Sequence, residues 1–95
     1  PAELEDVVMT HPDVTDCTVI PVEDDEAGEL PRAYVVARDG TDLKGLEEAV
    51  KAFVAERVAP YKKLRGGVVI TDAIPKTASG KILRRLVIEQ DRAGK

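Results

Sequence analysis

The feature that most constrains the fold is the apolar pattern of residues 43–58, which repeats at the spacing of one helical face over about four turns. Stretches rich in β-branched residues flank it at 14–22, 33–37 and 68–71, and such stretches favour strands. The sequence therefore predicts one small α+β domain. The apolar stripe consists of Leu43, Leu46, Ala49, Val50, Phe53, Val54 and Val58.

Two further helices are predicted at the ends of the chain. Apolar residues at helical spacing indicate a helix over 2–10 that stops before Pro12. Ser79 can cap a final helix that begins near Lys81, and Thr41 or Asp42 can cap the middle helix. In the final helix, the residues expected to face the core are Leu83, Leu86 and Val87.

The predicted order is helix, strand, strand, helix, strand, helix, which gives a sheet of about three strands packed by helices. The first two strands are joined by the polar residues 23–29 and are expected to pair as antiparallel neighbours. The third strand joins after a helical crossover. These patterns leave the strand order open.

The charge of the chain is divided unevenly. The net charge is −4, but residues 1–56 carry 15 acidic and 4 basic side chains, whereas residues 57–95 carry 3 acidic and 10 basic ones. A basic segment of this kind suits a solvated surface, a nucleic-acid patch or a face for phosphate-bearing small molecules. Composition alone leaves these three interpretations open.

The composition argues against several classes of function. Three aromatic residues, Tyr34, Phe53 and Tyr61, are too few for the stacking platform of a single-strand nucleic-acid binder. No apolar run approaches the roughly 18 residues that span a bilayer, so we expect no membrane span. Cys17 is the only cysteine, which excludes an internal disulfide and a multi-thiolate zinc site and fits a cytoplasmic location. The acidic residues 24–26 are interpreted as a solvated turn, so no metal site is predicted.

Residues 75–82 place two lysines in a loop of small residues between a strand and a helix. Gly80 and Lys81 match the end of a Walker phosphate-binding loop, but Pro75 replaces its leading glycine and Ile82 replaces its magnesium-binding hydroxyl. The residues instead suggest a loop that enters a narrow cleft and brings the Lys81 ammonium to an anion supplied from elsewhere. The alternative is an exposed loop in which Lys76 and Lys81 are simply solvated.

Four segments of the chain occur as motifs in a fixed order. They are Pro1-Ala2-Glu3-Leu4-Glu5, Asp24-Asp25-Glu26-Ala27-Gly28-Glu29-Leu30-Pro31, Lys62-Lys63-Leu64-Arg65-Gly66-Gly67-Val68 and Ile74-Pro75-Lys76-Thr77-Ala78-Ser79-Gly80-Lys81-Ile82-Leu83-Arg84. Together they resemble the C-terminal domain of the adenylate-forming enzymes, which include acyl-CoA synthetases, coumarate-CoA ligases and beetle luciferases. The likeness covers essentially the whole chain, and four motifs at compatible spacings make it specific.

The resemblance implies a two-step reaction in which a carboxylate attacks ATP, accompanied by Mg²⁺, and the acyl group then passes to coenzyme A. Lys81 matches the family lysine of the first step, where its ammonium would bridge the carboxylate and the nucleotide. In the family, the domain then swings about a hinge and withdraws this loop. The surrounding loop that would approach substrate and nucleotide consists of Pro75, Lys76, Thr77, Ser79 and Gly80.

The resemblance further implies that residues 1–95 are a single lid domain, with the hinge and the larger N-terminal adenylation domain lying outside this chain. We expect the domain alone to be inactive and to bind neither ATP nor coenzyme A. Its partners would be that N-terminal domain, a small carboxylic acid and, because similar loops of bacterial acyl-CoA synthetases are acetylated, a lysine acetyltransferase and deacetylase acting on Lys81. The positions that could meet coenzyme A or the other domain are Lys62, Lys63, Arg65, Gly66 and Gly67.

Arg84 and Arg85 follow the lysine loop and are expected to make interdomain salt bridges rather than ligand contacts. Two alternatives to the ligase remain. One is the C-terminal part of a peptide-synthetase adenylation domain, although the form of residues 75–84 is more similar to CoA ligases. The other is a basic anion- or nucleic-acid-binding module, which the few aromatic residues and the overall acidity disfavour.

Overall fold

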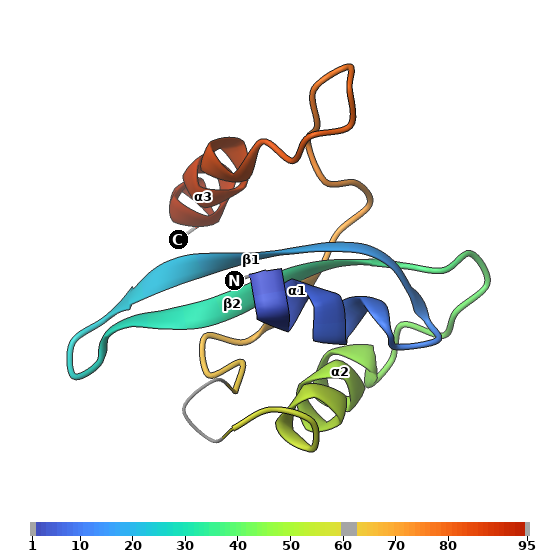
Figure 1. Ribbon diagram of the computed structural model, residues 1–95, viewed down its shortest axis with the longest axis horizontal. Helices are drawn as coiled ribbons and strands as arrows, with labels where there is room; N and C mark the ends of the chain where they lie inside the picture. Colours follow the sequence, from blue (N-terminus) through green and yellow to red (C-terminus); the bar gives the residue numbers. More distant parts are fainter. Residues whose placement is uncertain (1, 60–62, 95) are drawn as a thin grey trace.

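The computed structural model describes residues 2–59 and 63–94. Within these residues the chain forms three helices and a three-stranded sheet in the predicted order, which confirms the α+β class (Figure 1). The elements are α1 (Ala2–Met9), β1 (Val14–Asp24), β2 (Gly28–Ala37), α2 (Leu46–Ala55), β3 (Val68–Ile70) and α3 (Arg84–Ala93).

The sheet mixes antiparallel and parallel pairing, with the strand order β1-β2-β3. As predicted, β1 and β2 form an antiparallel pair, which runs from Val14 opposite Ala37 to Asp24 opposite Gly28. β3 pairs in parallel with β2, and a parallel neighbour requires a crossover, which α2 supplies. This order, which the sequence did not determine, makes β1 an edge strand.

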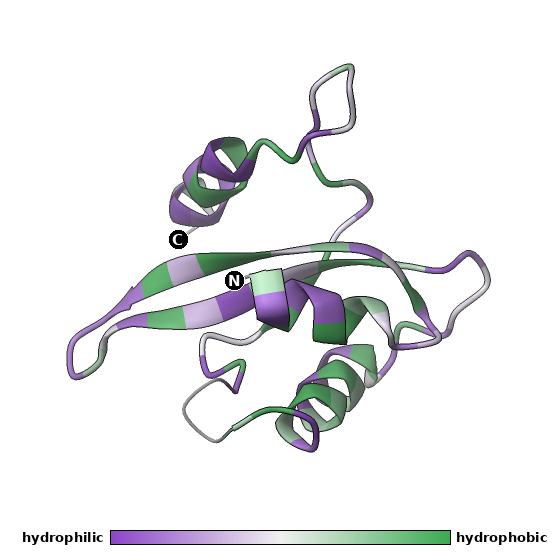
Figure 2. Ribbon diagram, in the orientation of Figure 1, coloured by the Kyte–Doolittle hydropathy of each residue, from purple (hydrophilic) through white to green (hydrophobic). Residues whose placement is uncertain are grey.

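The two long strands extend further than the sequence predicted. Residues 23–29 were expected to connect the strands, yet only residues 25–27 form the turn. The Asp24 carboxylate closes it by accepting hydrogen bonds from the backbone N–H groups of Glu26 and Ala27, at 3.1 and 2.9 Å. Figure 2 shows hydrophilic residues gathered at this turn.

Both faces of the sheet are covered, because α1 and α2 lie on one face and α3 lies on the other (Figure 1). Neighbouring residues of β1 alternate between two apolar clusters, with Val19 in the larger and Ile20 in the smaller, as the period of a strand requires. The helices contribute Leu4, Val8, Leu46, Val50 and Val54 to the larger cluster and Val87 to the smaller.

The middle helix, α2, begins later and ends earlier than predicted. Neither Thr41 nor Asp42 caps it; the residue before it is Gly45, in the left-handed region with φ 78° and without a side-chain cap. The Asp42 carboxylate instead accepts a hydrogen bond from the Lys44 N–H at 3.0 Å. This local turn competes with the helix and delays its start.

The prediction that Ser79 caps a helix starting near Lys81 is wrong. α3 begins at Arg84, and its N-cap position, Leu83, makes no side-chain cap bond. The preceding residues pair with one another as a hairpin, which uses the backbone groups that a helix would need. Two leucines predicted to face the core are also exposed: Leu43 by 54% and Leu86 by 40%.

Candidate active-site loop

Residues 75–83 form a loop that projects from the body of the domain between β3 and α3 (Figure 1). The backbone N–H of Leu83 donates to the carbonyl of Pro75 at 2.9 Å, and the N–H of Thr77 donates to the carbonyl of Lys81 at 2.8 Å. Between these bonds, Lys76 and Ile82 form an antiparallel bridge. The loop is therefore a small hairpin whose two ends, its roots, are joined to each other by backbone hydrogen bonds.

The tip of this hairpin is fixed by short-range hydrogen bonds. Gly80 has φ 90°, a conformation that favours glycine, and its N–H donates to the carbonyl of Thr77 at 2.9 Å. The Thr77 hydroxyl accepts from the backbone N–H of Lys81 at 3.1 Å and lies 3.0 Å from the Ser79 hydroxyl. The structure thus brings together the loop residues that the sequence singled out, and Pro75 lies at their root.

Lys81 is exposed near the tip of the hairpin. Its side chain makes no hydrogen bond or ion pair with any residue in the described part of the chain. A lysine held inside its own domain could not act on a neighbour, so the observed exposure is a necessary condition for the predicted role.

Lys76, the second lysine of the loop, has a different environment. Its ammonium forms an ion pair with the Asp16 carboxylate on β1, and the two side chains are 38% and 25% exposed. The other carboxylate oxygen of Asp16 accepts a hydrogen bond from the Cys17 N–H at 2.9 Å. Lys76 therefore ties the loop to the edge strand, a contact that the sequence did not predict.

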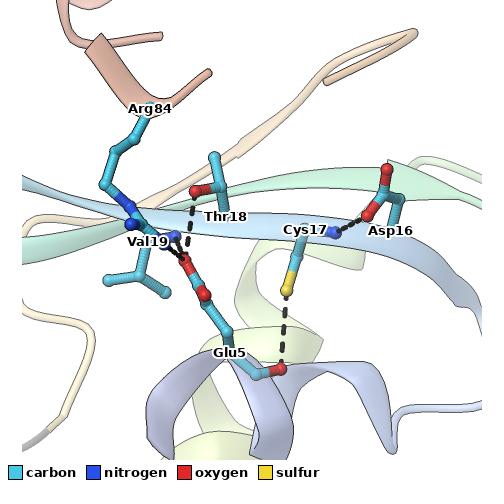
Figure 3. A network of polar contacts seen from close by, with 6 residues as sticks. All are labelled: Glu5, Asp16, Cys17, Thr18, Val19 and Arg84. Carbon is cyan, nitrogen blue, oxygen red and sulfur yellow. Dashed lines mark hydrogen bonds and ion pairs between the residues drawn. The ribbon is translucent and has the colours of Figure 1, made fainter. Parts of the chain in front are cut away.

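The other end of the loop is held by a network around Glu5 (Figure 3). One oxygen of its carboxylate, Oε2, accepts hydrogen bonds from the Thr18 hydroxyl at 3.1 Å, the Val19 N–H at 2.7 Å and Arg84 Nη2 at 2.6 Å. Arg84 was expected to make an interdomain salt bridge, but it pairs with α1 of its own domain. Because 79 positions separate Glu5 from Arg84, no local pattern in the sequence indicated the pair.

Gly66 and Gly67 let the basic loop that precedes β3, described from residue 63 to 67, pass close to β2. The N–H of Gly66 donates to the carbonyl of Pro31 at 2.8 Å, and Arg32 Nε donates to the carbonyl of Gly66 at 2.6 Å. A Cβ atom on Gly66 would lie 2.7 Å from the Pro31 carbonyl oxygen. Gly67 follows with φ 98°. Backbone geometry therefore explains why both positions are glycine.

The charged residues of the same loop give less structural information. Arg65 is exposed and Lys63 is half-buried, whereas Lys62 lies outside the described residues. A contact of this loop with coenzyme A or with the other domain stays a prediction. The same holds for Arg85, whose side chain is 89% exposed and forms an i,i+4 pair with Glu89 at 3.7 Å.

The thiol of Cys17 is not suited to nucleophilic chemistry. The side chain is buried beneath α1, and Sγ lies 3.5 Å from the backbone carbonyl of Glu5. Burial, reinforced by the negative charges of Glu5, Asp16 and Asp6, raises the pKa of the thiol to about 12. Since the thiolate is the reactive form, Cys17 is a packing residue.

The described residues place no group of three or more His, Cys, Asp or Glu side chains where they could hold a metal ion. None of the helices in the described ranges has the length and apolar character that a membrane crossing requires.

Comparison with known proteins places this fold and this loop in a family. The family model for the AMP-binding enzyme C-terminal domain matches residues 3–81. The chain is 54% identical over 89 residues to 4-coumarate--CoA ligase-like 4 of Oryza sativa and 49% identical over 89 residues to peroxisomal OPC-8:0-CoA ligase 1 of Arabidopsis thaliana, covering 94% of this chain and 16% of each relative. The solved structure of Mycobacterium tuberculosis fatty acyl CoA synthetase superposes with a TM-score of 0.86 at 34% identity, over 99% of this chain and 18% of that one.

The chain belongs to the family of AMP-binding enzyme C-terminal domains. It spans about one sixth of the length of the curated relatives that it matches. The matched part is thus the small domain of enzymes that are named as CoA ligases and acyl-CoA synthetases.

Proposed function

We propose that this domain is the mobile lid of an ATP-dependent acyl- or aryl-CoA ligase and that Lys81 acts in the first half-reaction. In that step a carboxylate oxygen of the substrate attacks the α-phosphorus of ATP. The new O–P bond forms as the bond between the α-phosphorus and the bridging oxygen breaks, and pyrophosphate leaves. In the second step the thiol of coenzyme A attacks the acyl carbon, loses its proton, and displaces AMP.

The observation that carries this proposal is the exposed Lys81 on a projecting hairpin whose tip and roots are held by hydrogen bonds. Two anions must meet in the first step, because both the carboxylate and the nucleotide are negatively charged. An ammonium between them offsets their repulsion and stabilises the charge on the transferring phosphoryl group. A fixed backbone matters here, since an electrostatic group is effective only where it is positioned in advance.

The other participants belong to the larger N-terminal adenylation domain. We assign the binding of ATP, its Mg²⁺ and the small carboxylic acid to that domain, with the present chain closing over them. The names of the relatives, 4-coumarate--CoA ligase-like, OPC-8:0-CoA ligase and fatty acyl CoA synthetase, support an acyl or aryl carboxylate as substrate. Rotation of the lid after adenylation would withdraw Lys81 and admit coenzyme A, in the manner of a domain-closure step.

The test is the substitution Lys81→Ala in the complete ligase, with Lys44→Ala as the matched control because Lys44 is an exposed lysine far from the loop in sequence. Acyl-adenylate formation, measured by ATP–pyrophosphate exchange in the absence of coenzyme A, should fall by about 10²-fold or more in Lys81→Ala. Thioester formation from added acyl-adenylate should change much less. A near-normal exchange rate in Lys81→Ala would remove this lysine from the mechanism.

The exposure of Lys81 also makes it available for reversible acetylation, which would remove its charge and with it the electrostatic role. We propose that an acetyltransferase and a deacetylase control the enzyme at this residue. Mass spectrometry of the native protein should find a fraction acetylated at Lys81 that changes with growth conditions. A lysine that stays unmodified under all conditions would contradict this proposal.

We further propose a cytoplasmic location, supported by the single reduced cysteine. One relative carries a peroxisomal name, so the peroxisome is the location to test against. Cell fractionation of the native protein, with cytoplasmic and peroxisomal marker proteins measured in parallel, separates the two.

A further inference from the structure

Two ion pairs hold the two roots of the lysine hairpin, residues 75–83, and the acidic partner in each pair lies on or beside β1, an edge strand of the sheet. Before the tip, Lys76 pairs with Asp16 of β1. After the tip, Arg84 pairs with Glu5 of α1. The hairpin is therefore fastened by side chains at both ends, in addition to its own backbone bonds.

The Glu5–Arg84 pair joins elements that lie on opposite faces of the sheet. α1 packs on one face and α3 begins on the other, so the two side chains meet at the edge formed by β1 (Figures 1 and 3). Arg84 is the first residue of α3 and follows Lys81 by only three positions. The pair therefore lies at the boundary between the hairpin and the last helix.

The surroundings of Glu5 make it a firm anchor. Its side chain is 16% exposed, and the same oxygen that binds Arg84 also accepts from the Val19 backbone N–H at 2.7 Å. Arg84 has a less complete set of contacts: its Nε atom is buried without a hydrogen-bond partner in the described part of the chain. A pair that leaves a buried donor unsatisfied is not arranged for maximum stability.

From these contacts we infer that Glu5 is a positioning residue for the lysine loop, acting through Arg84. The inference rests on the proposed function of Lys81 and deepens it. Glu5 sits outside the loop and contacts it only at its C-terminal root, yet it sets the direction in which the hairpin leaves the domain. Loss of the pair should let the root open while the core of the domain stays intact.

The first test is made on the 95-residue chain and is independent of catalysis. Amide hydrogen exchange is measured at Leu83, whose N–H closes the root on Pro75, in Glu5→Gln, Arg84→Met and Arg85→Met. Glu5→Gln retains an oxygen that can accept from the Val19 N–H. Arg85→Met is the matched control, because it removes the same charge at a neighbouring, 89% exposed position.

Exchange at Leu83 should be up to about fivefold faster in Glu5→Gln and Arg84→Met than in the control, the size expected for the loss of one partly exposed ion pair. Exchange at Val50, in the buried part of α2, should stay the same. Equal exchange at Leu83 in Arg84→Met and Arg85→Met overturns the inference. Equal acceleration at Leu83 and Val50 also overturns it, since the pair would then only stabilise the whole domain.

The second test uses the complete ligase. Glu5→Gln and Arg84→Met should lower kcat for adenylation by about tenfold, with KM for ATP unchanged, because a displaced lysine loses transition-state stabilisation. Thioester formation from added acyl-adenylate should stay normal, and Arg84→Lys should recover part of the adenylation rate. An equal loss in both half-reactions, or no loss in either, overturns the positioning role.

The two proposals fail in different ways. If Lys81→Ala adenylates normally, the proposed function of the lysine is wrong whatever Glu5 does. If Lys81→Ala is inactive in adenylation while Glu5→Gln and Arg84→Met behave like Arg85→Met, the lysine keeps its role and only the inference about Glu5 is lost.

Discussion

Tyr34 of β2 donates its phenolic hydrogen to the carboxylate of Asp91 on α3 at 2.6 Å, across 57 positions of the sequence. The same carboxylate oxygen accepts from Arg32 Nη1 at 2.7 Å. The side chain of Asp91 is 5% exposed and that of Arg32 is 25% exposed. This cluster fastens α3, the helix that directly follows the lysine hairpin, to the central strand of the sheet.

We expect Asp91→Ala to destabilise the domain by about 2–3 kcal/mol, because it leaves the Arg32 charge and the Tyr34 hydroxyl without this partner in a mostly buried site. Urea denaturation of the 95-residue chain measures the change. Arg92→Ala, at an adjacent position whose side chain is 70% exposed, should cost less than about 0.5 kcal/mol. Similar losses in the two variants would contradict a structural role for the cluster.

The same cluster predicts a pH dependence at alkaline pH. Burial, together with the hydrogen bond to Asp91, raises the pKa of Tyr34 from 10.0 to about 12. A raised folded-state pKa favours the protonated form, so its stabilisation is fully present below pH 10 and is lost as the pH rises towards 12. The difference in unfolding free energy between the native chain and Tyr34→Phe should therefore shrink over this range. A constant difference would show that the phenol titrates normally.

Cys17 should react slowly with thiol reagents. Its pKa of about 12 keeps the thiol protonated at pH 8, and burial limits access. Alkylation by iodoacetamide should be at least about 10²-fold slower in the native chain than in guanidinium-unfolded chain, where the thiol has an ordinary pKa. Rapid labelling of the native chain would contradict the buried position.

Gly66→Ala should destabilise the domain by about 1–3 kcal/mol, because the new methyl group overlaps the Pro31 carbonyl and the Val22 side chain, at 2.7 and 2.9 Å. Gly40→Ala is the contrasting variant. No atom lies within 4 Å of its Cβ position, so only its φ of 84° opposes the substitution, at a cost of about 1 kcal/mol. Thermal unfolding of the two variants compares the stability lost to steric overlap at Gly66 with the stability lost to backbone strain at Gly40.

The sequence predicted the elements well where one local pattern dominates. The helix at 2–10 and the strand at 14–22 are found close to their predicted bounds as α1 and β1. The starts of α2 and α3 were predicted poorly, because Asp42 and Ser79 make local turn contacts that a capping pattern does not distinguish from true caps.

The sequence named the residues of the candidate loop but not the residues that hold the loop in place. Lys81 and the residues around it could be found because the motif is contiguous. Asp16 and Glu5 could not be found, since they reach the loop from 60 and 79 positions away. The ordering β1-β2-β3 brings both carboxylates to one edge, and strand order is a tertiary property that local periodicity does not encode.

The edge of β1 has a second consequence, which concerns association between copies. The backbone N–H groups of Cys17 and Val19 are taken by the carboxylates of Asp16 and Glu5, and the next alternate position, Pro21, has no N–H to offer. A strand from another molecule would find no free donor at these three positions and would meet the Lys76–Asp16 and Glu5–Arg84 ion pairs. The contacts that hold the hairpin therefore also protect the β1 edge of the sheet from intermolecular β-pairing and aggregation.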